Sequence, residues 1–253
     1  MSPAHRSDGA DDAPVLVLSG SLGTTTAMWD PQIAAFARHY RVLRIDHPGH
    51  GDSPVPTAPV TVEGIARDLL ALLDELDIDR VDFCGLSLGG MVGQWLGANA
   101  PDRISGLVLA CTGASLGEPG AYAARAELVR REGTGILIDG ARERWFTPAF
   151  RDALAAQRIL DSLRTMSPQG YAACCKAVGT FDFRGDLQRI QPPTLVLYGE
   201  DDPVTTSEVL DKLATIRRAR RTGIAHAAHL ANVEQPEAFS AAVLSHLQEG
   251  AQA

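Results

Sequence analysis

The chain has 253 residues with a formal net charge of −8, and 45% of its residues are hydrophobic and 21% charged. These values are ordinary for a globular protein of one large or two small domains. They argue against a nucleic-acid partner, which needs a basic face, and no apolar run is long enough to cross a bilayer. The N-terminus lacks the apolar segment of a secretory signal, and the four cysteines show no CxxC spacing. We therefore expect a cytoplasmic protein with reduced thiols and no membrane partner.

Short apolar runs alternate with helical patterns along the chain. The runs that we interpret as buried strands are residues 15–20, 41–46, 81–85, 104–112 and 194–200. Residues 61–78 carry apolar side chains at helical spacing, with Thr61 as the predicted N-cap. A second helix is predicted after Ser87, over residues 88–100, and it stops before Pro101. Strands alternating with helices predict an α/β fold whose mostly parallel sheet is covered by helices on both faces.

The alternation breaks after residue 117. Residues 118–187 have a helical pattern and no strong strand, so we expect a helical cap inserted into a core formed by residues 1–117 and 188–253. The cap contains ten Lys and Arg and nine Asp and Glu residues, a net charge of +1, which leaves −9 for the core. This difference is a weak indication of an anionic ligand beneath the cap, because solvated arginines are a sufficient explanation.

The segment GLSLG, residues 85–89, has the pattern G-x-S-x-G between a predicted strand and a predicted helix. This is the context of a nucleophile elbow, in which the serine occupies a sharp turn and its oxygen projects above the sheet. Strand and helix approach closely there, so a Cβ at either flank would clash, and glycine removes it. The pattern predicts Ser87 as a nucleophile; a chance Gly/Ser loop is the alternative.

A serine nucleophile needs an oriented base, and in this architecture an acid and then a histidine follow the serine along the chain. We predict Asp202 as the orienting acid, because it follows Gly199 at G-x-x-D spacing in the turn that leaves a strand. Asp201 is the rival, and Glu200 is a third candidate. Those not used would be solvated loop carboxylates.

The base is predicted to be His229, because it precedes a loop that leads into the last helix near residues 234–236. His226, the competing candidate, is expected at a strand end. His47 and His50 follow the second strand and are out of order for the base, so we expect His50 to be a structural turn residue.

Two backbone N–H groups are candidates for stabilising a developing oxyanion. Leu88 begins the helix after the serine, where its N–H has no intrahelical partner. The second donor should come from the loop after the first parallel strand, residues 19–29, where Leu22 is the best candidate and Gly23 keeps the turn open.

Taken together, these motifs resemble the α/β-hydrolase superfamily, and within it the 3-oxoadipate enol-lactonases. The stretches that carry the resemblance cover nearly the whole chain: SGSLGTTTAMWDPQ (19–32), GLSLGGMVGQWLGANAPDRI (85–104), RWFTPAF (144–150), SPQGYAACCKAV (167–178) and HLANVEQPEAF (229–239). The elbow and the order of the triad are specific to the superfamily, whereas the SLGT–MW–PQ and GYAACC patterns are more specific to the lactonases.

The resemblance implies the roles of nucleophile for Ser87, orienting acid for Asp202 and base for His229, with Leu22 and Leu88 as oxyanion donors. It also implies that Arg144 and Trp145 lie near the pocket under the cap. Arg144 would then hold a substrate carboxylate as a bidentate pair, and Trp145 would form a wall for the substrate ring. The alternatives are a surface charge for Arg144 and a core aromatic for Trp145.

Two departures from the family pattern stand out. Such enzymes usually have an N-terminal hairpin before the first parallel strand, but fourteen residues precede Val15 here. We expect a truncated hairpin, of which PAHRSDG (3–9) is a remnant strand, or a misassigned start codon. In DHPGHGDSP (46–54), His47-Pro48 replaces an arginine that many of these lactonases carry before G-H-G, which suggests a changed substrate.

The resemblance implies a carboxylic-ester hydrolase of aromatic-compound catabolism that opens 3-oxoadipate enol-lactone to 3-oxoadipate through an acyl-enzyme. Its partner would be a small, anionic lactone or ester, with no metal or organic cofactor. A carboxylesterase, thioesterase, perhydrolase or specialised lactonase on the same triad is the first alternative. A ligand receptor that kept the fold is the second.

Overall fold

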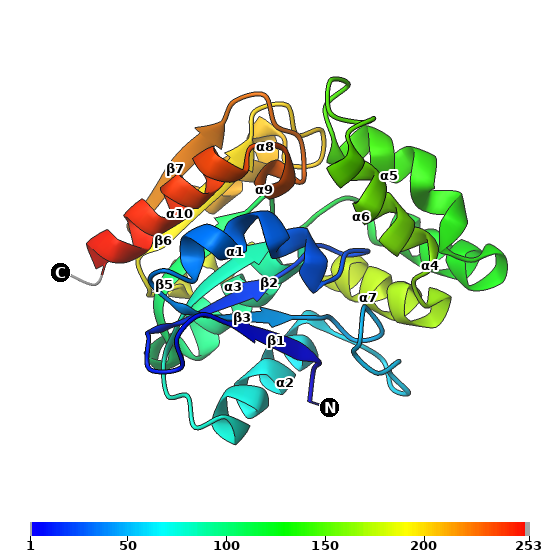
Figure 1. The fold of residues 1–253 in the computed structure, drawn as a ribbon. Helices are drawn as coiled ribbons and strands as arrows, with labels where there is room; N and C mark the ends of the chain where they lie inside the picture. Colours follow the sequence, from blue (N-terminus) through cyan, green and yellow to red (C-terminus); the bar gives the residue numbers. More distant parts are fainter. Residues whose placement is uncertain (1, 251–253) are drawn as a thin grey trace.

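The computed structural model describes residues 2–250, and in this part of the chain seven strands form one sheet (Figure 1). The strand order is β1-β3-β2-β4-β5-β6-β7; β1 is antiparallel to β3, and the other neighbouring strands are parallel. The strands are β1 (His5–Asp8), β2 (Val15–Ser19), β3 (Arg41–Ile45), β4 (Val81–Leu86), β5 (Ile104–Ala110), β6 (Thr194–Gly199) and β7 (Ala219–Ile224). The predicted α/β fold with a mostly parallel sheet is confirmed.

The two edges of the sheet differ from its centre. Strands β2 to β6 coincide with the five predicted apolar runs. At one edge, β1 is a single antiparallel strand within the segment interpreted as a remnant. At the other edge, β7 was not predicted, because Arg220, Arg221 and Thr222 are exposed and give the strand no apolar run.

Helices lie on both faces of this sheet and beside one end of it. They are α1 (Asp30–Phe36), α2 (Val62–Glu75), α3 (Leu88–Asn99), α4 (Pro119–Glu132), α5 (Ile138–Trp145), α6 (Leu154–Arg164), α7 (Pro168–Thr180), α8 (Ser207–Leu213), α9 (Ala231–Glu234) and α10 (Pro236–Gly250). α1 and α10 contact each other on one face, and α2 and α3 contact each other on the opposite face (Figure 1). The predicted N-cap of α2 is present, because the Thr61 hydroxyl accepts a hydrogen bond from the Gly64 N–H at 2.9 Å.

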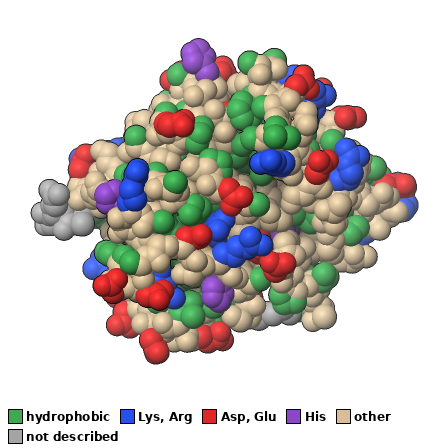
Figure 2. Space-filling model, in the orientation of Figure 1, with side chains coloured by type: hydrophobic (Ala, Val, Ile, Leu, Met, Phe, Trp, Pro, Cys, Tyr) green, Lys and Arg blue, Asp and Glu red, His purple; other side chains and the backbone are tan. Residues whose placement is uncertain are grey.

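Between β5 and β6, the chain forms α4 to α7, which lie together at the right of Figure 1, beside the carboxyl ends of the central strands. Acidic and basic side chains are mixed over the helices on this side, whereas acidic side chains predominate at the lower left (Figure 2). No helix among residues 2–250 is long and apolar enough to cross a membrane.

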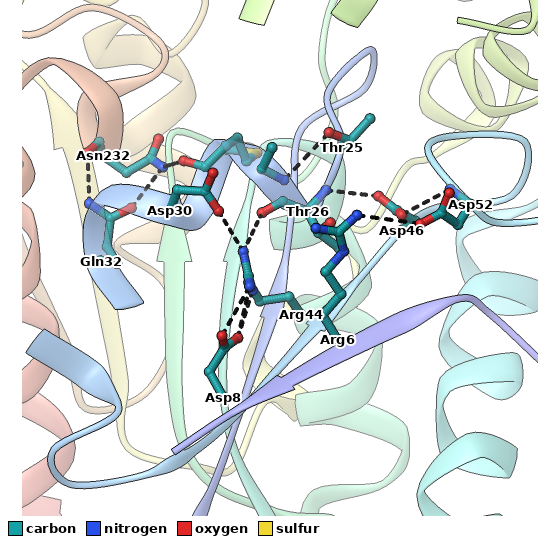
Figure 3. A network of polar contacts seen from close by, with 12 residues as sticks. Arg6, Asp8, Thr25, Thr26, Asp30, Gln32, Arg44, Asp46, Asp52 and Asn232 are labelled. Atoms are coloured by element: carbon teal, nitrogen blue, oxygen red, sulfur yellow. Dashed lines mark hydrogen bonds and ion pairs between the residues drawn. The ribbon is translucent and has the colours of Figure 1, made fainter. Parts of the chain in front are cut away.

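A polar network fixes the loop between β2 and α1 (Figure 3). The buried Arg44 guanidinium bridges Asp8 on β1, at 2.9 Å, and Asp30 on α1, at 2.7 Å. The Asp46 carboxylate accepts hydrogen bonds from the N–H groups of Thr26, at 2.8 Å, and Asp52, at 3.1 Å. The network therefore ties the loop after β2 and the start of α1 to β1 and to the end of β3.

The same region is connected to the chain after His229. The Gln32 amide on α1 donates to the Asn232 carbonyl at 2.8 Å, and the Asn232 amide donates to the Met28 carbonyl at 2.8 Å (Figure 3). Both side chains are fully buried. Two segments that are about two hundred residues apart in sequence are thus held against each other.

Candidate active site

The turn between β4 and α3 has the geometry of a nucleophile elbow. Ser87 lies at its apex with φ 57° and ψ −110°, a conformation that non-glycine residues rarely adopt. A Cβ on Gly85 would lie 2.1 Å from the Gly89 carbonyl oxygen, and one on Gly89 would lie 2.0 Å from the Ser19 carbonyl oxygen. Both glycines are therefore required by close backbone approach, as the steric argument from the sequence predicted.

Strand β5 and the residues after it hold this strained turn. The Ser87 N–H donates a hydrogen bond to the Ala110 carbonyl at 2.9 Å, and the Thr112 hydroxyl donates one to the Ser87 carbonyl at 2.7 Å. Both backbone polar groups of Ser87 are thus satisfied by the neighbouring strand. This fixes the direction of the side chain above the sheet.

His229 and Asp202 form a buried pair. The His229 Nδ1 lies 2.9 Å from Asp202 Oδ2, and the exposed fractions of the two side chains are 4% and 0%. Because a carboxylate only accepts hydrogen bonds, Nδ1 carries the proton and Nε2 is left as the acceptor. The Asp202 carboxylate also accepts from the Val204 N–H at 2.8 Å and from the Thr205 hydroxyl.

The charge state of Asp202 follows from these contacts. Burial raises the pKa of this carboxyl, but the charge and hydrogen bond of His229 and the donors of Thr205 and Val204 outweigh that effect. The pKa of Asp202 therefore lies below its usual value. The ionised carboxylate is the form that can orient an imidazole and stabilise its cation.

The competing candidates of the sequence analysis lie elsewhere. Glu200, Asp201 and His226 are all exposed. The Asp201 N–H nevertheless donates to the Ala227 carbonyl at 2.9 Å, which joins the two loops that carry Asp202 and His229. The same loops pack so closely that position 199 must be glycine, because a Cβ there would lie 2.3 Å from the Ala227 carbonyl oxygen.

Ser87 and His229 line one pocket between the sheet and helices α4 to α7. Within the described residues, their side chains form no hydrogen bond with each other in this structure. The cavity measures about 100 Å³. Its lining includes Leu22, Leu116, Tyr122, Arg125, Leu137, Arg144, Trp145, Leu163, Tyr171 and Val178.

The candidate oxyanion donors are the N–H groups of Leu22 and Leu88. Leu22 lines the pocket, and Leu88 is the first residue of α3, so its N–H has no acceptor within the helix. Among the backbone hydrogen bonds of turns, loops and helix caps in the described chain, neither the Leu22 N–H nor the Leu88 N–H is a donor. Both donors are therefore available to a ligand, and their role stays a prediction.

Two buried histidines fix the loop that carries Leu22. His50 Nε2 accepts a hydrogen bond from the Gly23 N–H at 3.1 Å, while its Nδ1 donates to the Pro48 carbonyl at 3.0 Å. His47 Nε2 donates to the Gly20 carbonyl at 2.9 Å. These hydrogen bonds give His50 the role of a structural turn residue, as expected from the sequence.

The histidine loop also touches helix α7. Gly49 and Gly170 pack backbone to backbone, since a Cβ on Gly49 would lie 2.3 Å from the Gly170 Cα. The ring of His50 stacks at 6.5 Å on Tyr171. Loop 47–50 thus joins the loop of Leu22 to the helical segment 118–187.

Arg144 and Trp145, at the end of α5, both line the pocket. Arg144 is half-buried, and Trp145 is 7% exposed and packs edge-on against Phe146 with ring centroids 6.5 Å apart. Trp145 is thus both a buried aromatic and part of the pocket wall. The sequence analysis did not find Arg125, on α4, or Tyr171, on α7, which line the same pocket.

Glu234 is a further residue that the sequence analysis did not assign to the site. One oxygen of its buried carboxylate accepts from the Thr147 N–H at 2.9 Å and the Thr147 hydroxyl at 2.7 Å. The other accepts from the Ala228 N–H, next to His229, at 2.6 Å. The Leu230 N–H donates to the Trp145 carbonyl at 3.0 Å. Glu234 therefore ties the chain after α5 to the loop that carries His229.

A larger cavity lies apart from this pocket. It measures about 200 Å³ and lies between the loop around residues 53–61 and α2. Its described lining contains no histidine, cysteine, lysine or arginine. The smaller pocket, which holds both a strained serine and a carboxylate-bound histidine, is therefore the candidate active site.

Comparison with known proteins identifies the family of the chain. Residues 15–242 match the model of the alpha/beta hydrolase family. The chain is 41% identical to 3-oxoadipate enol-lactonase 2 of Acinetobacter baylyi, over 93% of this chain and 89% of that protein. The enol-lactonase structure from Burkholderia xenovorans LB400 is 39% identical, with a TM-score of 0.93 over 97% of this chain and 96% of that one.

The structure of a hydrolase from Pseudomonas aeruginosa PA01 is 44% identical, with a TM-score of 0.92 over 96% of this chain and 93% of that one. The resemblance read from the sequence is thereby confirmed. With a matching family model over most of its length and such relatives, the chain belongs to the alpha/beta hydrolase family and is, like them, a hydrolase.

Proposed function

We propose that this chain hydrolyses an enol-lactone, with 3-oxoadipate enol-lactone as the substrate and 3-oxoadipate as the product, by a Ser-His-Asp mechanism. The observation that carries the proposal is the pairing of His229 with the ionised Asp202 in the pocket of the strained Ser87. The similarity to enol-lactonases over nearly the whole chain supports the choice of substrate.

In the proposed mechanism, Ser87 Oγ attacks the ring carbonyl while His229 Nε2 accepts its proton. The N–H groups of Leu22 and Leu88 stabilise the oxyanion. The ring C–O bond then breaks, and the enol oxygen leaves with a proton from His229, which gives an acyl-enzyme. Water, deprotonated by His229, attacks the acyl carbon and releases the acid and Ser87.

The enol leaving group is consistent with this arrangement. An enolate leaves more easily than an ordinary alkoxide, so His229 has little acid catalysis to supply at that step. We further propose that residues 118–187 act as a cap, because α4, α5 and α7 supply most of the pocket wall opposite Ser87. A closed pocket excludes water from the first step and strengthens the oxyanion interactions.

The test is the turnover of enzymatically generated 3-oxoadipate enol-lactone, followed by the loss of its absorbance. We expect rapid hydrolysis by the native protein and a loss of about 10⁶ in kcat on Ser87→Ala. His229→Ala should be as inactive, whereas His226→Ala, at an exposed position, is the matched control and should be active.

Each other outcome has a definite meaning. An inactive His226→Ala would refute the proposed triad. Cleavage of p-nitrophenyl acetate without turnover of the enol-lactone would support the proposed triad but exclude 3-oxoadipate enol-lactone as the substrate. In that case the enzyme would be an esterase, thioesterase or other lactonase on the same triad.

A further inference from the structure

We propose that Arg125, on α4, is a specificity-determining residue that binds a substrate carboxylate together with Arg144. This inference rests on the proposed function and makes it more specific. The substrate class would be a small ester or lactone with a free carboxylate on the part of the molecule that lies away from Ser87. The sequence resemblance had suggested Arg144 alone.

Aromatic neighbours hold Arg125 in the pocket wall. Its guanidinium carbon lies 5.0 Å from the centre of the Tyr122 ring, one turn earlier on the same helix. Arg125 also interacts electrostatically with Tyr171, which belongs to α7. Arg125, Tyr122 and Tyr171 all line the cavity that contains Ser87 and His229. A guanidinium stacked on an aromatic ring keeps its planar donors free for a carboxylate.

Arg125 and Arg144 differ from most of the other basic residues of the segment 118–187. Six of those other eight residues form ion pairs with Asp or Glu: Arg130, Arg131, Arg142, Arg164, Lys176 and Arg184. Within the described chain, Arg125 and Arg144 form no such pair, although the protein is acidic. Two half-buried cations therefore face the pocket without a carboxylate partner.

The two guanidinium groups are also close enough to repel each other. Burial lowers the pKa of Arg144, and the charge of Arg125 lowers it further. An anion between the two groups removes this repulsion and replaces lost hydration with charge-assisted hydrogen bonds. A ligand carboxylate is the natural anion, because planar guanidinium donors match its two oxygens.

The rest of the pocket limits what else the ligand can carry. Much of the remaining pocket wall is apolar, with Leu22, Leu137, Leu163 and Val178 among its residues. The substrate should therefore have a reacting carbonyl at one end, a short apolar body and a carboxylate at the other end. A neutral ester of the same length would leave both cations unpaired.

The experiment compares monomethyl succinate with dimethyl succinate, which share the reacting methyl ester and differ by one carboxylate. The measured quantity is the ratio of kcat/KM for the anionic ester to that for the neutral one. We expect the native protein to favour the anionic ester and Arg125→Gln to lower the ratio by about tenfold or more, the loss of one charge-assisted hydrogen bond.

Two further variants make the test specific. Arg125→Lys keeps the charge but lacks the planar donors, so its ratio should be intermediate. Arg130→Gln removes an exposed arginine of the same helix, paired with Glu127 at 2.9 Å, and should keep the native ratio. A native ratio in Arg125→Gln, or an equal loss in Arg130→Gln, would overturn the proposal.

A binding measurement separates this proposal from the proposed function. Monomethyl succinate is titrated calorimetrically into the Ser87→Ala variant. The same titration is made with a double variant that carries both Ser87→Ala and Arg125→Gln. Binding that weakens about tenfold in the double variant supports the carboxylate site even if no ester is hydrolysed. Equal affinity in the two proteins, or no binding to either, contradicts it.

Discussion

The two ends of the pocket are built in different ways. At the sheet end, Ser87, Asp202 and His229 follow strands or join loops whose backbones touch, and the protein satisfies most of their polar groups. At the helical end, Arg125 and Arg144 project from α4 and α5 without carboxylate partners in the described chain. The first arrangement is satisfied within the protein, whereas the second leaves two cations without a carboxylate partner.

If the proposed roles hold, this difference separates the residues that catalyse the reaction from those that recognise the substrate. A residue that acts in every turnover benefits from a position that close backbone packing enforces. A residue that selects a substrate must keep unsatisfied hydrogen-bonding capacity, because a group already paired inside the protein cannot discriminate. Changes at the sheet end should therefore reduce turnover of all substrates, and changes at the helical end should alter only the preference among them.

Beyond the loss already expected for Ser87→Ala, the largest effect in this comparison is expected for Asp202→Asn at the sheet end. Asparagine keeps the shape but offers an N–H or a neutral oxygen to His229 Nδ1, so the imidazole adopts the wrong tautomer or loses the charge that stabilises its cation. We expect kcat to fall by about 10⁴ for anionic and neutral esters alike. Steady-state kinetics on both esters measures this.

Asp201→Asn is the matched control, because it changes the neighbouring, exposed carboxylate. It should remain close to the native rate. A similar loss in both variants would mean that the acidic loop acts as a whole. A loss confined to one ester would remove the distinction between the two ends of the pocket.

The sheet end was predictable because its steric constraints require particular residues at fixed positions in the sequence. Gly85 and Gly89 are required where a Cβ would lie within about 2.1 Å of a carbonyl oxygen, and each is visible in the pattern around Ser87. The order of Ser87, Asp202 and His229 follows the order of the strands. Such signals are local, so the sequence alone was enough to choose Asp202 over Asp201.

The second prediction concerns Glu234, which connects the two ends. Its carboxylate accepts three hydrogen bonds, from the Thr147 N–H and hydroxyl and from the Ala228 N–H. In Glu234→Gln, the amide NH₂ must face one of these donors, so at least one bond is lost inside a buried site. We expect the free energy of unfolding to fall by about 1–3 kcal/mol. Urea denaturation measures the change.

Because Ala228 precedes His229, the same variant should also lower kcat, by about tenfold or less, on both esters. Glu237→Gln, at an exposed position in the first turn of α10, is the control and should match the native protein. Native stability in Glu234→Gln would show that this bridge does not hold the His229 loop.

The features that sequence reasoning missed have no local signal. Arg125 lies on a helix whose apolar side chains lack a clear periodic stripe, and its position in the pocket depends on how α4 packs against α7. Glu234 was read as part of a helix start, because its partners Thr147 and Ala228 belong to other segments. Long-range packing decides both roles, and one sequence does not encode it in a readable pattern.

The smallest effect is expected for loop 47–50, which joins the two ends of the pocket. It concerns how the free energy of unfolding depends on pH. Burial lowers the pKa of His47 to about 4 and that of His50 to about 3. Unfolded histidine titrates near pH 6.5, so below that pH the unfolded state binds more protons than the folded state. The free energy of unfolding should therefore decrease as the pH falls from about 7 towards 4.

Since each such histidine contributes up to about 1.4 kcal/mol per pH unit, His50→Gln should reduce that slope by about this amount. Urea denaturation at several pH values measures the slopes, with His226→Gln as the matched control at an exposed position. An equal reduction in both variants would show that His50 is not the buried neutral group that holds the Gly23 N–H. A reduction confined to His50→Gln would indicate that the join between the sheet end and the helical end depends on an uncharged imidazole.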